Sequence, residues 1–124
     1  MSRTNFENLR VYNLAEELAD EIWEIVLHWD TFARDTVGRR IVRSADRTGA
    51  NIAEGTGRYN FQDNRRFVRT ARGSLNETQH FLRRAFRGNL LTTADANKIK
   101  LLVNNFALQL NSYLKSIGRD HKGE

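Results

Sequence analysis

The chain has 124 residues, 40% of them apolar, and it contains neither cysteine nor proline. This length suits one domain with its own core and is short for two domains. The lack of cysteine excludes disulfides and thiolate metal sites, and no run of about 18 apolar residues is present to cross a membrane. Because the opening MSRTNFENLR lacks the apolar segment of a secretory signal, we expect a cytoplasmic protein.

Positive charge is concentrated in the middle of the chain, although the net charge is only +5. Residues 1–33 contain two arginines and seven acidic residues, whereas residues 34–87 contain thirteen arginines and five acidic residues. Of the twenty basic residues, sixteen are arginine, whose planar guanidinium matches phosphate and stacks on bases. This distribution favours an anionic polymer as partner. The alternative is that the basic segment only balances the acidic first third.

The first predicted helix runs from Asn5 to His28. Thr4 and Glu7 have the spacing of a capping box at its start. Its apolar residues recur every three or four positions, which indicates a helix packed on one face. These residues are Val11, Leu14, Ala15, Leu18, Ile22, Ile25, Val26 and Trp29.

The second predicted helix starts near Val37, after a turn in which Thr31 or Asp35 can act as the cap. It stops near Gly55 and Gly57, where glycine can take the backbone conformation that ends a helix. Its packing face consists of Val37, Ile41, Ala45, Thr48, Ile52 and Gly55. Its opposite face carries Arg40, Arg43, Arg47 and Arg58, with Asn51 and Glu54. Between them lies a flank that lets another backbone come close, made of Gly38, Val42, Gly49 and Ala53.

The third predicted helix is the clearest amphipathic segment. Asn60 and Asp63 resemble a cap and a first-turn acid, and the helix extends to about Gly88. Its heptad stripe consists of Val68, Ala71, Leu75, Thr78, Leu82 and Ala85. At about 100° per residue, a ladder of arginine and amide side chains lies on another face. The ladder consists of Arg65, Arg69, Arg72, Asn76, Gln79, Arg83 and Arg87.

The fourth predicted helix follows a cap formed by Thr92 with Asp95 and runs to Gly118. Its packing stripe consists of Ile99, Leu102, Val103, Phe106, Leu110, Tyr113 and Ile117. Three further leucines widen the apolar arc beyond one seam, namely Leu101, Leu108 and Leu114. The excess predicts burial against a second subunit. We therefore expect one domain over residues 1–118, followed by a polar tail at 119–124.

The sequence contains little that points to catalysis or to a metal. Glu77 and His80 form one Glu-x-x-His pair, but a di-iron bundle needs two such pairs and further inward carboxylates. On a helix, both residues lie away from the apolar stripe. Asp46 and Glu54 are flanked by arginine, which indicates structural pairing rather than acid–base work. We therefore expect no enzymatic activity, no catalytic residues, no metal and no cofactor.

Two segments resemble a known family, SADRTGANIAEGTGR and FVRTARGSLNET. They are similar to the signature of the four-helix bundle proteins encoded in intervening sequences of 23S rRNA genes, which in turn resemble the accessory variability proteins of diversity-generating retroelements. The resemblance covers nearly the whole chain. It implies an all-α, up-down-up-down antiparallel four-helix bundle, assembled as a ring-shaped homo-oligomer with five subunits favoured. It also implies a basic surface that binds nucleic acid, and it brings no catalytic residues.

The residues that carry this resemblance are interpreted as architecture. They include Ser44, Asn51, Glu54, Gly55, Gly73 and Ser74. Inside a helix, Gly73 costs about 1 kcal/mol relative to alanine, which another helix crossing there would explain, at the flank of Gly49 and Ala53. Ser44, Asn51 and Glu54 are expected to supply hydrogen bonds at the edge of the packing.

The first functional hypothesis is a non-enzymatic scaffold that contacts RNA or DNA phosphates without reading bases. The proposed contacts are Arg40, Arg43, Arg47, Arg58, Arg65, Arg69, Arg72, Arg83 and Arg87. The alternative is a protein-interaction adaptor whose basic face binds an acidic partner, such as a reverse transcriptase or a neighbouring subunit. No membrane partner is expected.

Overall fold

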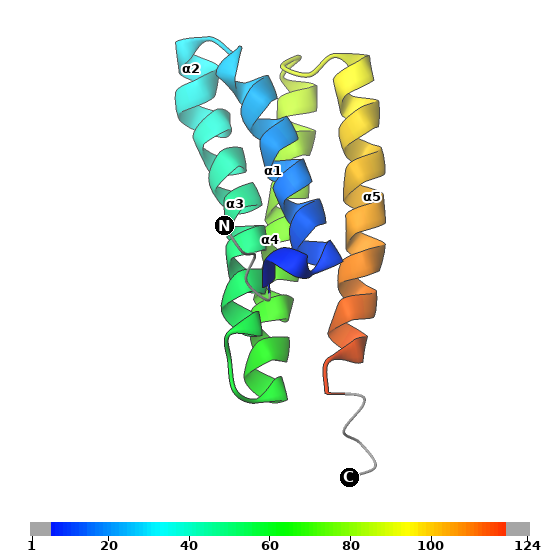
Figure 1. Ribbon diagram of the computed structural model, residues 1–124. Coiled ribbons are helices and arrows are strands. Elements are labelled where there is room, and N and C mark those ends of the chain that lie inside the picture. The colour runs from blue at the N-terminus through cyan, green and yellow to red at the C-terminus, as the bar shows by residue number, and fades with distance from the viewer. Residues whose placement is uncertain (1–5, 119–124) are drawn as a thin grey trace.

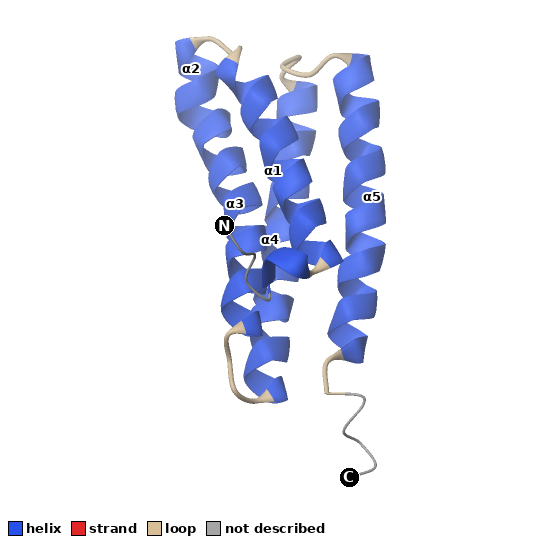
Figure 2. Ribbon diagram, viewed as in Figure 1, coloured by secondary structure: helices blue, strands red, loops and turns tan. Residues whose placement is uncertain are grey.

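The computed structural model describes residues 6–118, and all regular structure in this range is helical (Figure 1, Figure 2). The elements are η1 (Phe6–Asn8), α1 (Arg10–Leu27), α2 (Thr31–Ala33), η2 (Arg34–Gly38), α3 (Arg39–Thr56), α4 (Phe61–Arg87) and α5 (Thr93–Ser116). Because α2, η2 and α3 follow one another without a break, they form one long helix with a π-helical segment. Together with α1, α4 and α5 it makes a four-helix bundle, as expected. The predicted tail at 119–124 lies outside the described residues.

Consecutive helices run in opposite directions and lie side by side (Figure 1). In the bundle, α1 contacts α3 and α5, and α4 contacts the same two helices. Within the described residues, α1 and α4 share no backbone contact, so they occupy opposite corners. The order of the helices around the core is therefore the order of the chain, as in an antiparallel up-down-up-down bundle.

The core consists of the apolar stripes that periodicity predicted, and all four helices contribute to it. Its buried members are Val11, Leu14, Ala15, Leu18, Ile22, Val26, Ile41, Ala45, Ile52, Val68, Ala71, Leu75, Ile99, Val103, Phe106, Leu110 and Ile117. Tyr113 and Leu102 pack against this cluster while remaining partly exposed. The faces predicted for the helices are thus confirmed, because residues at helical spacing share one side of a helix and that side is buried in the bundle.

The start of the second long helix differs from the prediction. Helical structure begins at Thr31 rather than near Val37. The cap is Asp30, whose side chain accepts a hydrogen bond from the backbone N–H of Ala33 at 2.9 Å. The proposal that Thr31 or Asp35 is the cap is therefore wrong. Asp30 has extended backbone angles, which aim its carboxylate at the open N–H groups of the first turn.

The start of α1 is Arg10, and its flanking residue Leu9 makes no side-chain capping bond. The predicted helix began at Asn5 with a capping box that uses Thr4. Both residues lie outside the described part of the chain, but the predicted helix is wrong over residues 6–9, where the chain forms η1 and then an extended Leu9. The helix ends at Leu27, one residue before the predicted end at His28.

The end of α3 lies where it was expected, but the physical reason differs. The helix ends at Thr56, and the capping residue Gly57 has φ −80°, a right-handed conformation that any residue can adopt. The requirement for glycine lies at Gly55, where a Cβ atom would come within 2.5 Å of Asn64 Oδ1. Gly55 therefore permits close contact between α3 and α4 rather than a special turn.

The caps predicted for the last two helices are confirmed. Asn60 accepts a hydrogen bond from the backbone N–H of Asp63 at 2.7 Å. Thr92 accepts one from the backbone N–H of Asp95 at 3.0 Å. Both capping side chains satisfy N–H groups that have no partner within the helix.

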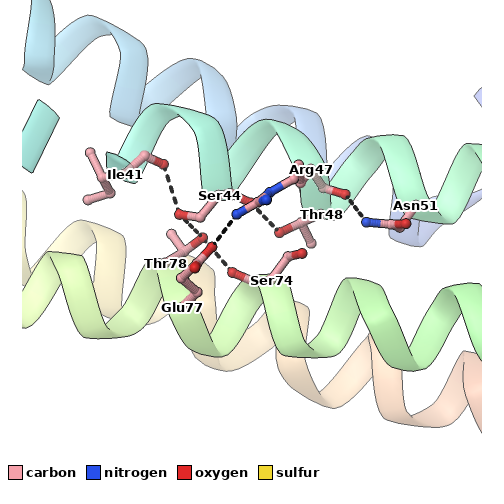
Figure 3. Close-up of polar contacts among 8 residues, drawn as sticks. All are labelled: Ile41, Ser44, Arg47, Thr48, Asn51, Ser74, Glu77 and Thr78. Carbon is pink, nitrogen blue, oxygen red and sulfur yellow. Dashed lines mark hydrogen bonds and ion pairs between the residues drawn. The ribbon is translucent and has the colours of Figure 1, made fainter. Parts of the chain in front are cut away.

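A buried polar contact joins α3 to α4 (Figure 3). The Thr78 hydroxyl donates to the Ser44 hydroxyl oxygen at 2.9 Å, and Ser44 donates to the carbonyl of Ile41 at 3.1 Å. Both side chains are completely buried. These small residues let the two helices approach, and their hydroxyls remain satisfied away from water.

We expect Leu75→Ala to lower the free energy of unfolding by about 2–5 kcal/mol, because it leaves a cavity in the core. Leu75 is 1% exposed. Leu82→Ala, on the same stripe but partly exposed, should cost less. Urea denaturation of the two variants measures the difference. Equal costs would mean that the described face of α4 is wrong.

The Ser44–Thr78 contact can be tested by a double-mutant cycle with Ser44→Ala and Thr78→Val. Each single variant should lose about 0.5–1.5 kcal/mol of stability. The double variant should lose less than the sum by about 0.5 kcal/mol, because the second change removes a partner that is already gone. Strictly additive costs would show that the two hydroxyls do not interact.

Candidate nucleic-acid interface

Arginines of α3 line a polar groove between α3 and α4. The groove has a volume of about 340 Å³ and is lined by Arg39, Arg40, Arg43, Arg47, Glu77 and Phe81. Arg40 and Arg43 are exposed. Within residues 6–118, neither makes an ion pair or a side-chain hydrogen bond. Their full charge therefore faces solvent.

Two other predicted arginines of this region are paired with carboxylates. Arg47 Nη2 lies 2.6 Å from Glu77 Oε1, across the α3–α4 interface (Figure 3). Arg58 Nη2 lies 2.6 Å from Glu54 Oε1, four residues earlier in the chain. Both pairs are at the surface, so each contributes little to stability but reduces the positive charge locally. Asp46 and Glu54 were both expected to pair with arginine, and Glu54 does.

Asp46, the other acid expected to pair with arginine, makes no ion pair among the described residues. Burial of its carboxyl group and, secondly, the negative charge of Asp20 on α1 raise the pKa of Asp46 above its ordinary value. Both causes disfavour the ionised form.

Some arginines of the α4 ladder contact the α5 segment, whereas others face solvent. Arg65 Nη1 donates to the carbonyl of Ile117 at 2.8 Å, and Arg72 Nη1 donates to Asn111 Oδ1 at 3.2 Å. At these two positions the ladder therefore contacts another part of the chain and is not free for a partner. An arginine side chain is long enough to reach the neighbouring helix from the edge of the exposed face.

Three rungs of the ladder remain open to solvent. Arg69, Arg83 and Arg87 are exposed and make no ion pair or side-chain hydrogen bond within residues 6–118. Arg83 also lines a groove of about 540 Å³ between α4 and α5, together with Lys100. Together with Arg40 and Arg43, these residues form what we call the open arginine set.

The topology keeps the positive charge of α4 away from the acidic helix. α1 contains five acidic residues and one arginine, whereas α3 and α4 together contain eleven arginines and four acidic residues. In the described residues, the only ion pair between α1 and another helix joins Glu21 to Lys98 of α5, at 3.1 Å. The acidic residues of α1 thus form no ion pair with the arginines of α3 and α4. Direct ion pairing with α1 therefore does not account for the basic faces within the described residues.

The residues interpreted as architecture have varied environments. Ser44 is at the centre of the α3–α4 contact, and Ser74 is buried beside it. Asn51 donates to the carbonyl of Arg47 in its own helix at 2.9 Å. The proposed helix crossing at Gly73 is wrong, because nothing would lie within 4 Å of a Cβ atom there. Gly49 instead lies against α1, where a Cβ would be 3.5 Å from that of Ala15.

Sequence reasoning gave no role to several residues at the surface. Arg39 lines the α3–α4 groove, while Arg66 and Arg84 lie on the exposed part of α4. Tyr59 is fully exposed in the loop between α3 and α4. The position of Tyr59 could have indicated its exposure from the sequence. An aromatic residue inside a polar turn belongs to no apolar stripe, so packing in the core does not explain it.

Comparison with known structures supports the fold. A protein of unknown function from the S23 ribosomal protein family of Bacteroides thetaiotaomicron has a similar structure, with a TM-score of 0.76 and 22% sequence identity. The match covers 86% of this chain and 96% of that one. No curated protein matches the sequence. Among the described helices, none combines the length and the apolar character needed to span a membrane.

The motifs on α3 and α4 lie within a longer family match. The sequence model of the 23S rRNA-intervening sequence proteins matches residues 7–112, which include almost all of the bundle. The matched range contains both faces of the α3–α4 interface and all of the open arginine set. The chain therefore belongs to the 23S rRNA-intervening sequence protein family.

Proposed function

We propose that this protein is a non-enzymatic cytoplasmic scaffold that binds RNA or DNA through the phosphate backbone. The observation that carries the proposal is the open arginine set, five exposed guanidinium groups on α3 and α4 without a carboxylate partner in the described chain. Arginine presents a rigid fork of donors that matches phosphate oxygens. Several such groups on two adjacent helices favour a polyanion over a small anion.

The arrangement supports backbone contact rather than base reading. The set is distributed along the surfaces of two helices, and Arg40 and Arg43 lie at a groove between them. Phosphates recur regularly along a strand, so several arginines can engage one backbone regardless of its sequence. In this proposal Arg47, Arg58, Arg65 and Arg72 are secondary contacts, because each already has a partner within the chain.

A second candidate function is an adaptor for an acidic protein. A groove of about 510 Å³ lies between α1 and α3, with an apolar floor that includes Trp23 and Leu27. Arg34, Arg39 and Arg43 lie among the residues that line it. An apolar floor with basic residues beside it suits an acidic amphipathic helix. We include a reverse transcriptase among such partners only on the resemblance that the sequence motifs suggested to accessory variability proteins.

We also infer that copies of the chain assemble into a closed homo-oligomer, with five subunits favoured by the family resemblance. Leu101 and Leu108 on α5 are 72% and 69% exposed, whereas Leu114 packs against the core. Leu101 lines a groove that also contains Glu17 and Glu21 of α1, together with Lys98, which pairs with Glu21. Exposed leucines beside acidic residues are suited to a basic, partly apolar surface of another copy.

The phosphate-binding proposal is tested with the double variant Arg40→Gln, Arg43→Gln. Binding to RNA and to duplex DNA should weaken for every sequence, because two phosphate contacts are lost. The slope of log affinity against log salt should become shallower by about 2, or roughly one per lost contact. Fluorescence anisotropy over a salt series measures both effects.

A matched control removes the same amount of charge elsewhere, with Arg10→Gln on α1 and Lys115→Gln on α5. Both residues are exposed and carry no ion pair in the described chain. The control should keep most of the affinity. If the two double variants behave alike, net charge alone explains binding. If the wild-type protein binds no nucleic acid but captures an acidic helical peptide, the adaptor function replaces this proposal.

The assembly proposal is tested with Leu101→Gln and Leu108→Gln together. The double variant should dissociate into smaller species while its helical content stays unchanged, because neither side chain belongs to the core. Multi-angle light scattering measures the mass. Asn104→Ser, on the exposed surface of the same helix, should leave it unchanged. A wild-type particle of 14.4 kDa at micromolar concentration would contradict assembly.

A further inference from the structure

The loop between α3 and α4 displays an aromatic ring that the fold does not use. Tyr59 is as exposed as in an extended peptide, at 105%. The loop lies at the end of the bundle away from the α1–α2 and α4–α5 connections (Figure 1). Keeping an aromatic ring in water forgoes the free energy that its burial would supply. The stability of the described bundle therefore does not account for Tyr59.

The backbone on both sides of Tyr59 is held by hydrogen bonds. The N–H groups of Gly57 and Arg58 donate to the carbonyls of Glu54 and Gly55, at 3.2 and 3.1 Å. After Tyr59, the side chain of Asn60 caps α4. The ring is thus carried by a short, anchored segment, so little ordering is needed when it binds a partner.

Arginine and a second aromatic ring surround the base of this loop. The guanidinium carbons of Arg58 and Arg66 lie 4.6 and 4.7 Å from the centre of the Phe67 ring. Such contacts hold both cations in place. Arg58 donates to Glu54, and Arg66 Nη2 lies 3.6 Å from Asp63 Oδ1. A guanidinium has five N–H donors, so each arginine keeps donors for a phosphate. Residues 55–70 contain four arginines and one acidic residue.

We propose that this loop binds an unpaired stretch of nucleic acid, with one base stacked on Tyr59 and the adjacent phosphates held by Arg58 and Arg66. The inference rests on the proposed phosphate-binding function and adds a ligand class to it. Bases within a duplex are stacked on their neighbours, so their faces are not available to a side chain. An unpaired base offers its face, and stacking tolerates any base identity. The combination of an exposed ring and fixed cations favours single strands.

The experiment compares Tyr59→Ala with the wild-type protein on two probes, a fluorescein-labelled oligouridylate and an RNA duplex of equal length. Loss of one stacked base should weaken binding to the oligouridylate by about 5- to 150-fold. Duplex binding should stay within about twofold, because it depends on phosphates alone. Tyr59→Phe, which keeps the ring, should retain the affinity of the wild type for both probes.

Phe32→Ala provides a matched control, since Phe32 is also strongly exposed, at 78%, but lies on α2 at the other end of the bundle. It should leave single-strand binding unchanged. The inference is overturned if Tyr59→Ala binds the oligouridylate like the wild type, if Phe32→Ala is equally weakened, or if Tyr59→Ala changes the particle mass.

The two proposals fail in different ways. If the wild-type protein binds neither probe, the proposed phosphate-binding function is wrong. The proposed stacking site, which depends on that function, is then wrong as well. If both probes bind and only the Arg40→Gln, Arg43→Gln variant is weakened, phosphate binding stands and the stacking site at Tyr59 is refuted.

Discussion

The close packing of α3 against α4 is the contact on which both the bundle and the candidate interface depend. Gly55 admits Asn64 at a distance that a Cβ atom would not allow. The Ser44 and Thr78 hydroxyls then meet in the middle of the same interface. Because these small residues bring the helix surfaces together, Arg47 can reach Glu77, and the arginines of α3 line a groove at α4. Bulkier residues would separate the two helices and, with them, the two sets of positive charge.

The topology of the bundle turns an uneven charge distribution along the chain into a polarised surface. In an up-down-up-down arrangement the first and third long helices lie at opposite corners. Here these are the acidic α1 and α4, the helix with the most arginines. Coulombic attraction between surface charges at opposite corners is largely screened by solvent. The positive charge of α4 is therefore little compensated by the acidic residues of α1.

Much of the fold could be predicted from the sequence, because it depends on local periodicity and on capping chemistry. The core stripes, the caps at Asn60 and Thr92 and the ends of α3 and α4 follow from residues within a few positions of one another. The predictions that were wrong concern tertiary contacts or the choice between two neighbouring capping residues. Asp30 was a better cap than Thr31, and Gly73 faces open space rather than a crossing helix.

By itself, the sequence determined that the chain forms four long helices, which face of each helix is apolar and where the arginines are concentrated, since all three depend on residue types and their spacing along the chain. Only the tertiary structure decided which arginines are open. Arg65 donates to the carbonyl of Ile117, just after α5, and Arg72 donates to Asn111 on α5. By contrast, Arg40 and Arg43 pair with no carboxylate in the described residues. The partner of a long side chain depends on which helix is packed beside it, and helical spacing carries no information about that neighbour.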